Sequence, residues 1–317
     1  MKSLGGMALS AYALAYAKPG MASQPTLDVV VPFPPGGGTD VLGRVVAAQL
    51  DQTLSRSVIV ENKAGASGML GADFVAKSQA NGNTMLFSGL VPSIKYYNLS
   101  TDALLKKLSP VCAIAHSYYM VAVTAGLQAA TFQELVELAR KQPGRLSFGT
   151  PGNATPQHIA TELLQVRTAT QMMHVPYRGT GPMMTDLMGG QIQVVVATVA
   201  AVEPYLKSGR LKVLAVTSPQ RLADFPQFPT IAECGYPGFT AEIGYATYVP
   251  ARTAAGVIQT LNTGLNQALQ SAAVRKSLTT QGFIPVGGTP RQLESSLRTE
   301  MDNVAGLMKQ GRIKIEL

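Results

Sequence analysis

Short runs of branched apolar residues alternate along the chain with stretches in which apolar residues recur at helical spacing. The runs 27–31, 57–61 and 84–87 predict buried strands, because each is short, apolar and bounded by turn residues. The stretch 39–54 has apolar residues at positions 41, 42, 45, 46 and 50, which predicts an amphipathic helix, and another helix is predicted to end at Lys77. Strands that alternate with helices predict a parallel sheet.

The same alternation continues in the second half of the chain. Strands are predicted at 120–124, 146–149, 172–176, 192–198 and 212–217. Helices are predicted at 131–141, from Thr155 onward, at 182–188, 254–270 and 290–310, after an extended stretch near 240–250. Two successive α/β units followed by a helical tail predict an α/β fold with two lobes, in which the tail returns to the first lobe.

The N-terminal segment has the pattern of an export signal. Lys2 precedes an uncharged stretch from residue 4 to 17, and small residues at 15 and 17 or at 20 and 22 provide cleavage sites. We therefore expect residues 1–23 to be a signal peptide and the protein to be periplasmic. No cysteine precedes Cys112, so we expect no lipid anchor.

Composition narrows the class of protein further. The 317 residues are 46% hydrophobic and 14% charged, with a net charge of +8, which is typical of a folded globular chain. Two cysteines and three histidines argue against a zinc cluster or a disulfide scaffold, so we expect no metal and no cofactor. The densest basic spot is Lys106-Lys107, which is too small for a nucleic-acid surface, so we expect no nucleic-acid partner.

The first candidate for chemistry is the glycine-rich loop 33–40, which joins a predicted strand to a predicted helix. Ligands of open α/β sheets collect at such loops, and backbone N–H groups at a helix N-terminus favour anions. The glycines at 38 and 43 have the spacing of a phosphate-binding loop, but Arg44-Val45 replaces the Lys-Ser/Thr that this motif requires. The alternative is a tight turn that needs glycine for its backbone conformation.

The second unit repeats this arrangement in the loop 148–158. Thr150, Asn153 and Thr155 offer polar groups there, and Thr155 followed by Pro156 predicts a helix start. His158 falls in the first helical turn, where it either contacts a ligand or bonds back to the loop. A third loop, 174–182, contains Arg178, which is able to bind a carboxylate or to remain solvated.

The chain lacks the patterns of nucleophilic catalysis. There is no G-x-S-x-G elbow, and neither cysteine lies at the start of a helix. Matched anion-favouring loops in both units, without a catalytic motif, predict a binding protein that closes on its ligand rather than an enzyme.

Four motifs occur in a fixed order: 31–40 with Arg44, 60–68 with Gly71, 174–179 with 186–191, and Arg221 with 228–239. Together they resemble the receptors of tripartite tricarboxylate transporters, also called Bug proteins. The resemblance implies a two-lobed, periplasmic-binding-protein-like fold of type II, with a mainly parallel sheet flanked by helices in each lobe. With the crossing strands of such receptors, we expect lobe 1 at 24–122 and 247–317 and lobe 2 at 123–246.

The resemblance also implies a small carboxylate between the lobes, with one carboxylate held by backbone groups and water near the first loop. Carried onto this chain, the ligand-binding residues are Phe33, Pro34, Gly36, Gly37, Thr39, Asp40, Ser88, Gly149, Thr150, Asn153, Thr155, His158 and Thr198. The implied partners are the membrane subunits of a tripartite transporter, and we expect a monomer.

Two other functions remain open at this point. An orphan periplasmic sensor would present its closed form to a membrane signalling protein instead of a transporter. An α/β enzyme would use the glycine-rich loop for a phosphate-bearing ligand, and turnover or dependence on Mg²⁺ would reveal it.

Overall fold

The computed structural model describes residues 25–90 and 100–311. The predicted signal peptide, 1–23, lies outside these residues. Within the described ranges, no helix combines the length and the apolar character needed to cross a membrane.

A first sheet is built around β1 (Leu27–Val31), which runs parallel to β2 (Val58–Asn62) and β3 (Thr84–Gly89). It continues through β9 (Glu242–Pro250), which is antiparallel to β3, and β4 (Leu108–Thr124), which is antiparallel to β9. The short β10 (Ile284–Pro285) pairs with β4. The predicted strand–helix alternation at the start of the chain is therefore confirmed as a parallel unit.

A second sheet is built around β5 (Ser147–Thr150), which runs parallel to β6 (Met173–Pro176) and β7 (Val194–Thr198). The far end of β4 closes this sheet, because it pairs antiparallel with β7 and with β8 (Leu211–Val216). In each sheet the strands are thus parallel to one another, except that those next to β4 and β9 pair with them in the antiparallel sense. The sheets are therefore mixed, whereas mainly parallel sheets were predicted. The α/β fold itself is confirmed.

The 17-residue strand β4 joins the two sheets. Its residues from Leu108 to Tyr118 pair with β9, and those from Tyr119 to Thr124 pair with β7 and β8. The strand therefore changes sheets between Tyr118 and Tyr119. The lobe boundaries at 122 and 246 stay a prediction.

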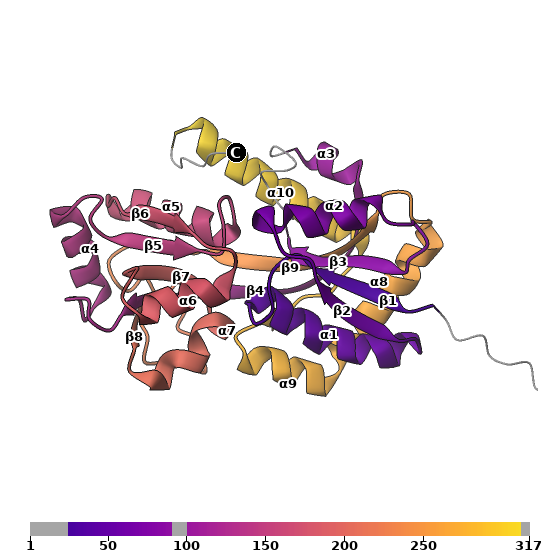
Figure 1. The fold of residues 1–317 in the computed structure, drawn as a ribbon, viewed down its shortest axis with the longest axis horizontal. Helices are drawn as coiled ribbons and strands as arrows, with labels where there is room; N and C mark the ends of the chain where they lie inside the picture. The colour runs from indigo at the N-terminus through magenta and orange to yellow at the C-terminus, as the bar shows by residue number, and fades with distance from the viewer. Residues whose placement is uncertain (1–24, 91–99, 312–317) are drawn as a thin grey trace, which may run out of the picture.

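Helices cover both faces of each sheet (Figure 1). Along β1, Val29 and Val31 pack in one core with the helices Gly38–Leu54 and Ala255–Gln270. Val30 packs in the opposite core with the helices Met69–Lys77 and Pro290–Lys309. This alternation follows from the two-residue period of a strand. The helices over the first sheet are α1 (Gly38–Leu54), α2 (Met69–Lys77), α3 (Thr101–Leu105), α8 (Ala255–Gln270), α9 (Ala272–Thr280) and α10 (Pro290–Lys309).

The second sheet is covered in the same way. Val194 and Val196 of β7 face the core that contains α4 and α5, whereas Val195 and Ala197 face α6 and α7. The helices are α4 (Phe132–Lys141), α5 (Pro156–Thr168), α6 (Thr180–Met188) and α7 (Val199–Val202), with 3₁₀ turns η1 (Ala66–Gly68) in the first unit and η2 (Glu203–Ser208) in the second.

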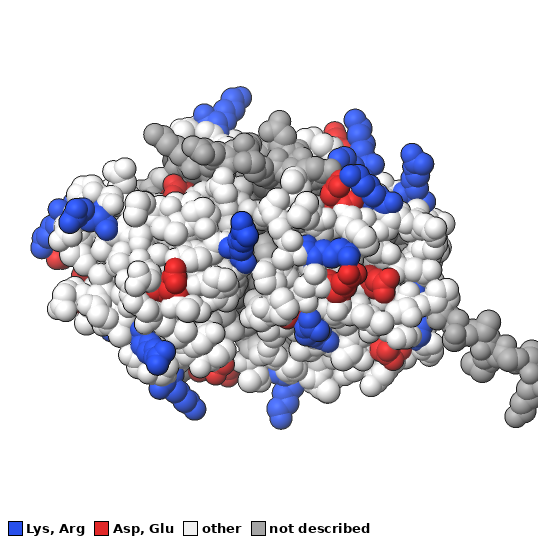
Figure 2. Space-filling model, viewed as in Figure 1, with Lys and Arg blue, Asp and Glu red and all other residues white. Residues whose placement is uncertain are grey.

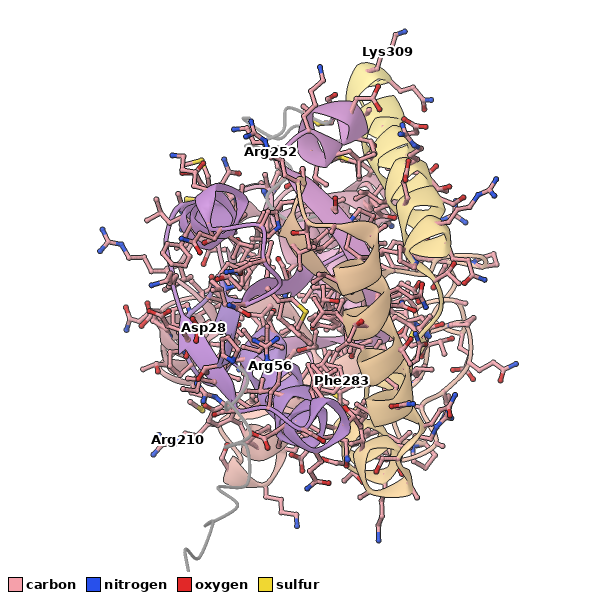
Figure 3. The ribbon with its side chains drawn as sticks, turned by 90° about the vertical axis from the view of Figure 1, so that its right-hand side faces the viewer. Asp28, Arg56, Arg210, Arg252, Phe283 and Lys309 are labelled. Atoms are coloured by element: carbon pink, nitrogen blue, oxygen red, sulfur yellow. The ribbon has the colours of Figure 1, made fainter. Side chains whose placement is uncertain are left out.

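Charged side chains are spread over the surface of both units (Figure 2). Figure 3 views the first sheet from its end remote from the second sheet, where Asp28 and Arg56 interact electrostatically. On the face that Figure 2 shows, Lys and Arg side chains are scattered among Asp and Glu, with wide uncharged surface between them. The described residues on that face form no basic stripe of the kind that follows a nucleic-acid backbone.

Candidate functional site

A cavity of about 40 Å³ lies where the carboxyl ends of the strands of both sheets meet. The segments that line it come from both units and from the crossing strand β9. The lining residues are Phe33, Pro34, Gly37, Gly38, Thr39, Ser67, Ser88, Gly89, Pro151, Ala154, Thr155, Pro156, Gln157, Thr180, Ile243 and Tyr245. Among these described residues none carries a charged side chain.

Two helix N-termini face this cavity with unused backbone donors. Within the described chain, the N–H groups of Gly38 and Thr39 in α1 and of Gln157 and His158 in α5 have no hydrogen-bond acceptor. The first N–H groups of a helix carry a partial positive charge, so both ends favour an anion. Hydroxyl groups of Thr39, Ser88 and Thr180 add neutral donors around them.

A larger hollow of about 870 Å³ lies between β9, α5 and the end of α10. Its lining includes three carboxylates, those of Glu242, Glu300 and Asp302. Three carboxylates in one hollow repel an anion. Burial raises the pKa of Glu300, and repulsion by the Glu242 carboxylate raises it further. The smaller, uncharged cavity is therefore the candidate anion site.

The first loop, 33–40, is held by a network around Asp40 that lies behind the cavity. The Asp40 carboxylate accepts hydrogen bonds from the Gly36 N–H (2.9 Å), from the Arg44 guanidinium (3.0 Å) and from Asn62 (2.8 Å). Asn62 also donates to the Phe33 carbonyl at 3.0 Å. Burial acts to raise the pKa of Asp40, but these hydrogen bonds outweigh it and hold the pKa below its usual value.

The second loop, 150–157, is held by neutral groups. The imidazole Nδ1 of His158 accepts a hydrogen bond from the Ala154 N–H at 3.1 Å. The Thr155 hydroxyl, expected to cap the helix, instead donates to the Gly152 carbonyl at 2.8 Å. That leaves the helix N-terminus open toward the cavity.

Three stacked rings, those of His158, His174 and Phe148, support this loop. The His158 and His174 rings lie 3.8 Å apart between centroids, and His174 stacks on Phe148 at 4.9 Å. Nε2 of His174 lies 2.7 Å from the Thr150 hydroxyl, which donates to the Gly152 carbonyl at 3.0 Å. A hydroxyl has one proton to give, so His174 Nε2–H acts as the donor to Thr150.

Both histidines of the stack are held neutral. Burial, together with the neighbouring His174, lowers the pKa of His158 to about 4. Burial also lowers the pKa of His174. An imidazolium at either position would lie against another ring, and the His158 ring is almost fully buried.

Glycines occur where the two units come closest across the cavity. A Cβ on Gly37 would lie 3.1 Å from the Thr180 hydroxyl, and one on Gly179 would lie 2.8 Å from Pro34. A Cβ on Gly38 would meet both Thr198 and Tyr245 at 3.0 Å. The units approach this closely because these positions lack side chains.

Part of the predicted residue set lines the cavity. Phe33, Pro34, Gly37, Thr39, Ser88 and Thr155 do so. Thr198 lies directly behind it, where its hydroxyl bonds with Tyr245. The ligand-binding role of these residues stays a prediction.

The other predicted residues lie outside the lining. Asp40, Thr150 and His158 support the loops, as described above; of the two roles open for His158, the structure shows the bond back to the loop. Gly149 packs beneath its loop, since a Cβ there would lie 2.5 Å from Ile192. Gly36 and Asn153 belong to the loops but do not line the cavity.

Sequence reasoning missed several lining residues. Ser67, Thr180, Ile243 and Tyr245 lie in four separate segments that only the tertiary fold brings together. Thr180 offered one sequence signal, because it follows Gly179 in a loop already singled out. In the structure it is the first residue of α6. Within the described residues, no three His, Cys, Asp or Glu side chains converge as a metal site.

Comparison with known proteins gives a consistent result. The sequence profile of the family described as "Tripartite tricarboxylate transporter family receptor" matches residues 42–312. Protein BugT of Bordetella pertussis is 35% identical over 300 residues, covering 92% of this chain and 90% of BugT. The structure described as R. palustris Rpa4515 with adipate superposes with a TM-score of 0.84 at 29% identity, covering 92% and 98% of the two chains. The periplasmic binding protein BugD gives a TM-score of 0.84 at 25% identity, covering 92% and 99%.

Proposed function

Since this chain belongs to the tripartite tricarboxylate transporter receptor family, we propose that it binds a small carboxylate in the cavity between its two sheets. The family is one of receptors rather than enzymes. The observation that carries the proposal is the pair of helix N-termini, α1 and α5, whose unused N–H groups face one uncharged cavity from opposite sheets.

This geometry suits a carboxylate better than a cation or a neutral sugar. Each helix end contributes about half a positive charge, and hydrogen bonds from backbone N–H groups to a carboxylate are charge-assisted. The similarity to an adipate-bound protein of R. palustris supports an acid as the ligand. Ordered water can complete the contacts, because bridging waters bind nearly as well as direct donors.

Ligand entry requires the two units to separate. A cavity of about 40 Å³ is far smaller than the roughly 300 Å³ or more of ordinary ligand pockets. The strands that connect the units, β4 and β9, are where such a movement would bend the chain. We place the first lobe at 24–122 and 247–317 and the second at 123–246, with closure driven by ligand contacts from both lobes.

Family membership supports a cellular role in the periplasm. We propose that residues 1–23 export the chain as a signal peptide and that it acts in the periplasm as a monomer. There it delivers its ligand to the membrane subunits of a tripartite transporter.

A thermal-shift screen of residues 24–317 tests the carboxylate proposal. The panel contains adipate, shorter and longer dicarboxylates, monocarboxylates and a tricarboxylate, with phosphorylated metabolites as controls. An acid present at 100 times its dissociation constant adds about 2.7 kcal/mol to the free energy of unfolding. Stabilisation by phosphorylated compounds alone, or by none of the acids, contradicts the proposal.

A matched pair of glycine substitutions locates the binding site. Gly37→Ala places a methyl group 3.1 Å from Thr180 across the cavity, and we expect it to weaken binding of the active acid. Gly181→Ala lies one residue beyond Thr180, with no atom within 4 Å of the added methyl, and we expect it to bind normally. Equal effects of the two substitutions would place the ligand elsewhere.

A further inference from the structure

The cavity wall contributed by the second loop contains a strained residue. Ala154 lines the cavity, is 5% exposed, and has a φ of +57°. Residues with a Cβ rarely adopt this left-handed conformation, because the Cβ crowds the following carbonyl oxygen. Something in the surrounding structure must therefore hold Ala154 in place.

The Ala154 N–H donates to two acceptors, Oδ1 of the adjacent Asn153 and Nδ1 of His158, each at 3.1 Å. His158 is the acceptor that ties Ala154 to helix α5 and so constrains the loop from outside. Residue 158 is the third residue of α5, and it accepts from the residue that precedes the N-cap. Two other helices use the same arrangement with a carboxylate as acceptor: Asp40 of α1 accepts from Gly36, and Glu134 of α4 accepts from Ala130. Only α5, of these three, uses an imidazole.

The choice of acceptor fits the position of each helix. The end of α4 is solvated and away from the cavity, so the charge of Glu134 is harmless there. Asp40 lies beside the cavity, but the guanidinium of Arg44 neutralises it at 3.0 Å. No cation contacts residue 158 in the described chain, where the titratable groups that face the ring are His174 from β6 and Glu162 at 3.9 Å.

We propose that His158 is a positioning residue for ligand binding: its neutral Nδ1 holds Ala154 in the left-handed conformation without adding negative charge beside the bound carboxylate. The inference rests on the proposed function. It assigns to one side chain two separable properties, an acceptor atom and the absence of charge. Each property is removed by a different substitution.

Three substitutions separate these properties. His158→Phe keeps a ring on His174 but has no acceptor. His158→Asn supplies an uncharged oxygen with the same reach as Asp40 in α1, and His158→Asp supplies that oxygen with a charge. Ala154→Gly removes the Cβ that makes the left-handed conformation unfavourable. The probe is adipate or, if another panel acid stabilises the wild type more, that acid, titrated by calorimetry at pH 7.5.

We expect His158→Phe to weaken binding about tenfold, which equals about 1.4 kcal/mol. Adding Ala154→Gly to this variant should recover most of the loss, and His158→Asn should bind within about threefold of the wild type. His158→Asp should bind at least tenfold more weakly than His158→Asn at low salt, with a gap that narrows as salt screens the charge. Wild-type affinity in His158→Phe, or equal affinity of the Asn and Asp variants, overturns the inference while the proposed function stands.

A measurement without ligand tests whether His158 positions Ala154. It remains decisive even if no acid binds, which is the outcome that would refute the proposed function. The free energies of unfolding of the wild type, His158→Phe, Ala154→Gly and the double variant form a mutant cycle. We expect the two substitutions to be non-additive, because glycine at 154 no longer needs the constraint. Additive effects show that His158 does not position Ala154.

Discussion

The two loops that face each other across the cavity share a backbone plan and differ in what holds it. In the first, Gly36 is left-handed (φ +86°) and its N–H is accepted by the charged Asp40. In the second, Ala154 is left-handed (φ +57°) and its N–H is accepted by the neutral His158. Glycine adopts this conformation without strain, so the first loop keeps its shape more readily if its acceptor is lost.

This contrast shows how two binding loops can favour the same anion without competing charges. The first loop uses a carboxylate and cancels it with Arg44 behind the cavity. The second uses an uncharged acceptor and relies on stacked rings. The first loop should therefore be destabilised when a member of the Asp40–Arg44 ion pair is removed. The second loop should be destabilised when His158 is protonated.

Removal of the Asp40 carboxylate should have the largest effect on stability. Asp40→Ala leaves the Gly36 N–H, Arg44 and Asn62 without their shared acceptor, and we expect a loss of about 2–3 kcal/mol in the free energy of unfolding. Asp40→Asn keeps an oxygen for Gly36 and should lose about half as much. Urea denaturation measures both, and a loss under about 0.5 kcal/mol in Asp40→Ala would contradict the role of this network.

Acid should loosen the second loop before the first. The pKa of His158 is about 4 in the folded protein, below its ordinary value of 6.5, so the unfolded chain binds more protons between these values. Its stabilising contribution is complete above pH 6.5 and falls as the pH is lowered toward 4. Asp40, whose pKa is also lowered, keeps its contribution until the pH falls below about 3.8.

We therefore expect the wild type to lose about 1–2 kcal/mol more between pH 7 and pH 5 than His158→Asn, which cannot titrate at this position. Urea denaturation at the two pH values measures the difference. His174, whose pKa burial also lowers, is present in both proteins, and its contribution differs between them through its repulsion of a protonated His158. Equal losses in the two proteins would show that His158 is not held neutral by the fold.

The Thr150 hydroxyl should affect only the second loop. Thr150→Val breaks the link from His174 to the Gly152 carbonyl and should cost about 1 kcal/mol, whereas Thr150→Ser keeps the hydroxyl and should cost less. Hydrogen exchange should quicken at amides of 152–158 and stay unchanged at 36–40. Faster exchange in both loops would mean that they are not held independently.

The smallest effect is expected from Arg44. Its side chain is 50% exposed, so Arg44→Ala should lower the free energy of unfolding by only about 0.5 kcal/mol. Removal of the cation should weaken anion binding more than it weakens the fold, because Asp40 then stays uncompensated beside the cavity. Calorimetric titration of Arg44→Ala and Arg44→Lys compares loss of charge with loss of the guanidinium geometry, and undiminished affinity in Arg44→Ala would contradict this account.

Much of the fold was predictable because local patterns and tertiary structure agree. The strand, glycine-rich loop and helix from Leu27 to Leu54 were placed correctly, as was the helix start at Thr155-Pro156. The elements α3, α9 and β10 were not predicted. With five residues in α3 and two in β10, neither of these is long enough to show a periodic pattern. Both cysteines are buried and unpaired.

The site was only partly predictable, for a physical reason. The sequence identifies which loops join strands to helices, but it does not show which way each side chain of a loop points. Asp40 and His158 therefore looked like ligand contacts, although both point back to the backbone of their own loop. Tyr245 and Ser67 became visible only through the crossing strand and the approach of the two units.

The central claim is that one carboxylate ligand is held by both helix N-termini at once. The most direct test follows the amide signals of ¹⁵N-labelled protein by NMR during titration with the acid that stabilises it most. We expect the amide signals of Gly38 and Thr39 in α1 and of Gln157 and His158 in α5 to shift together, with one midpoint. Shifts confined to one of these helices, or found instead around the acidic hollow near Glu242, would contradict it.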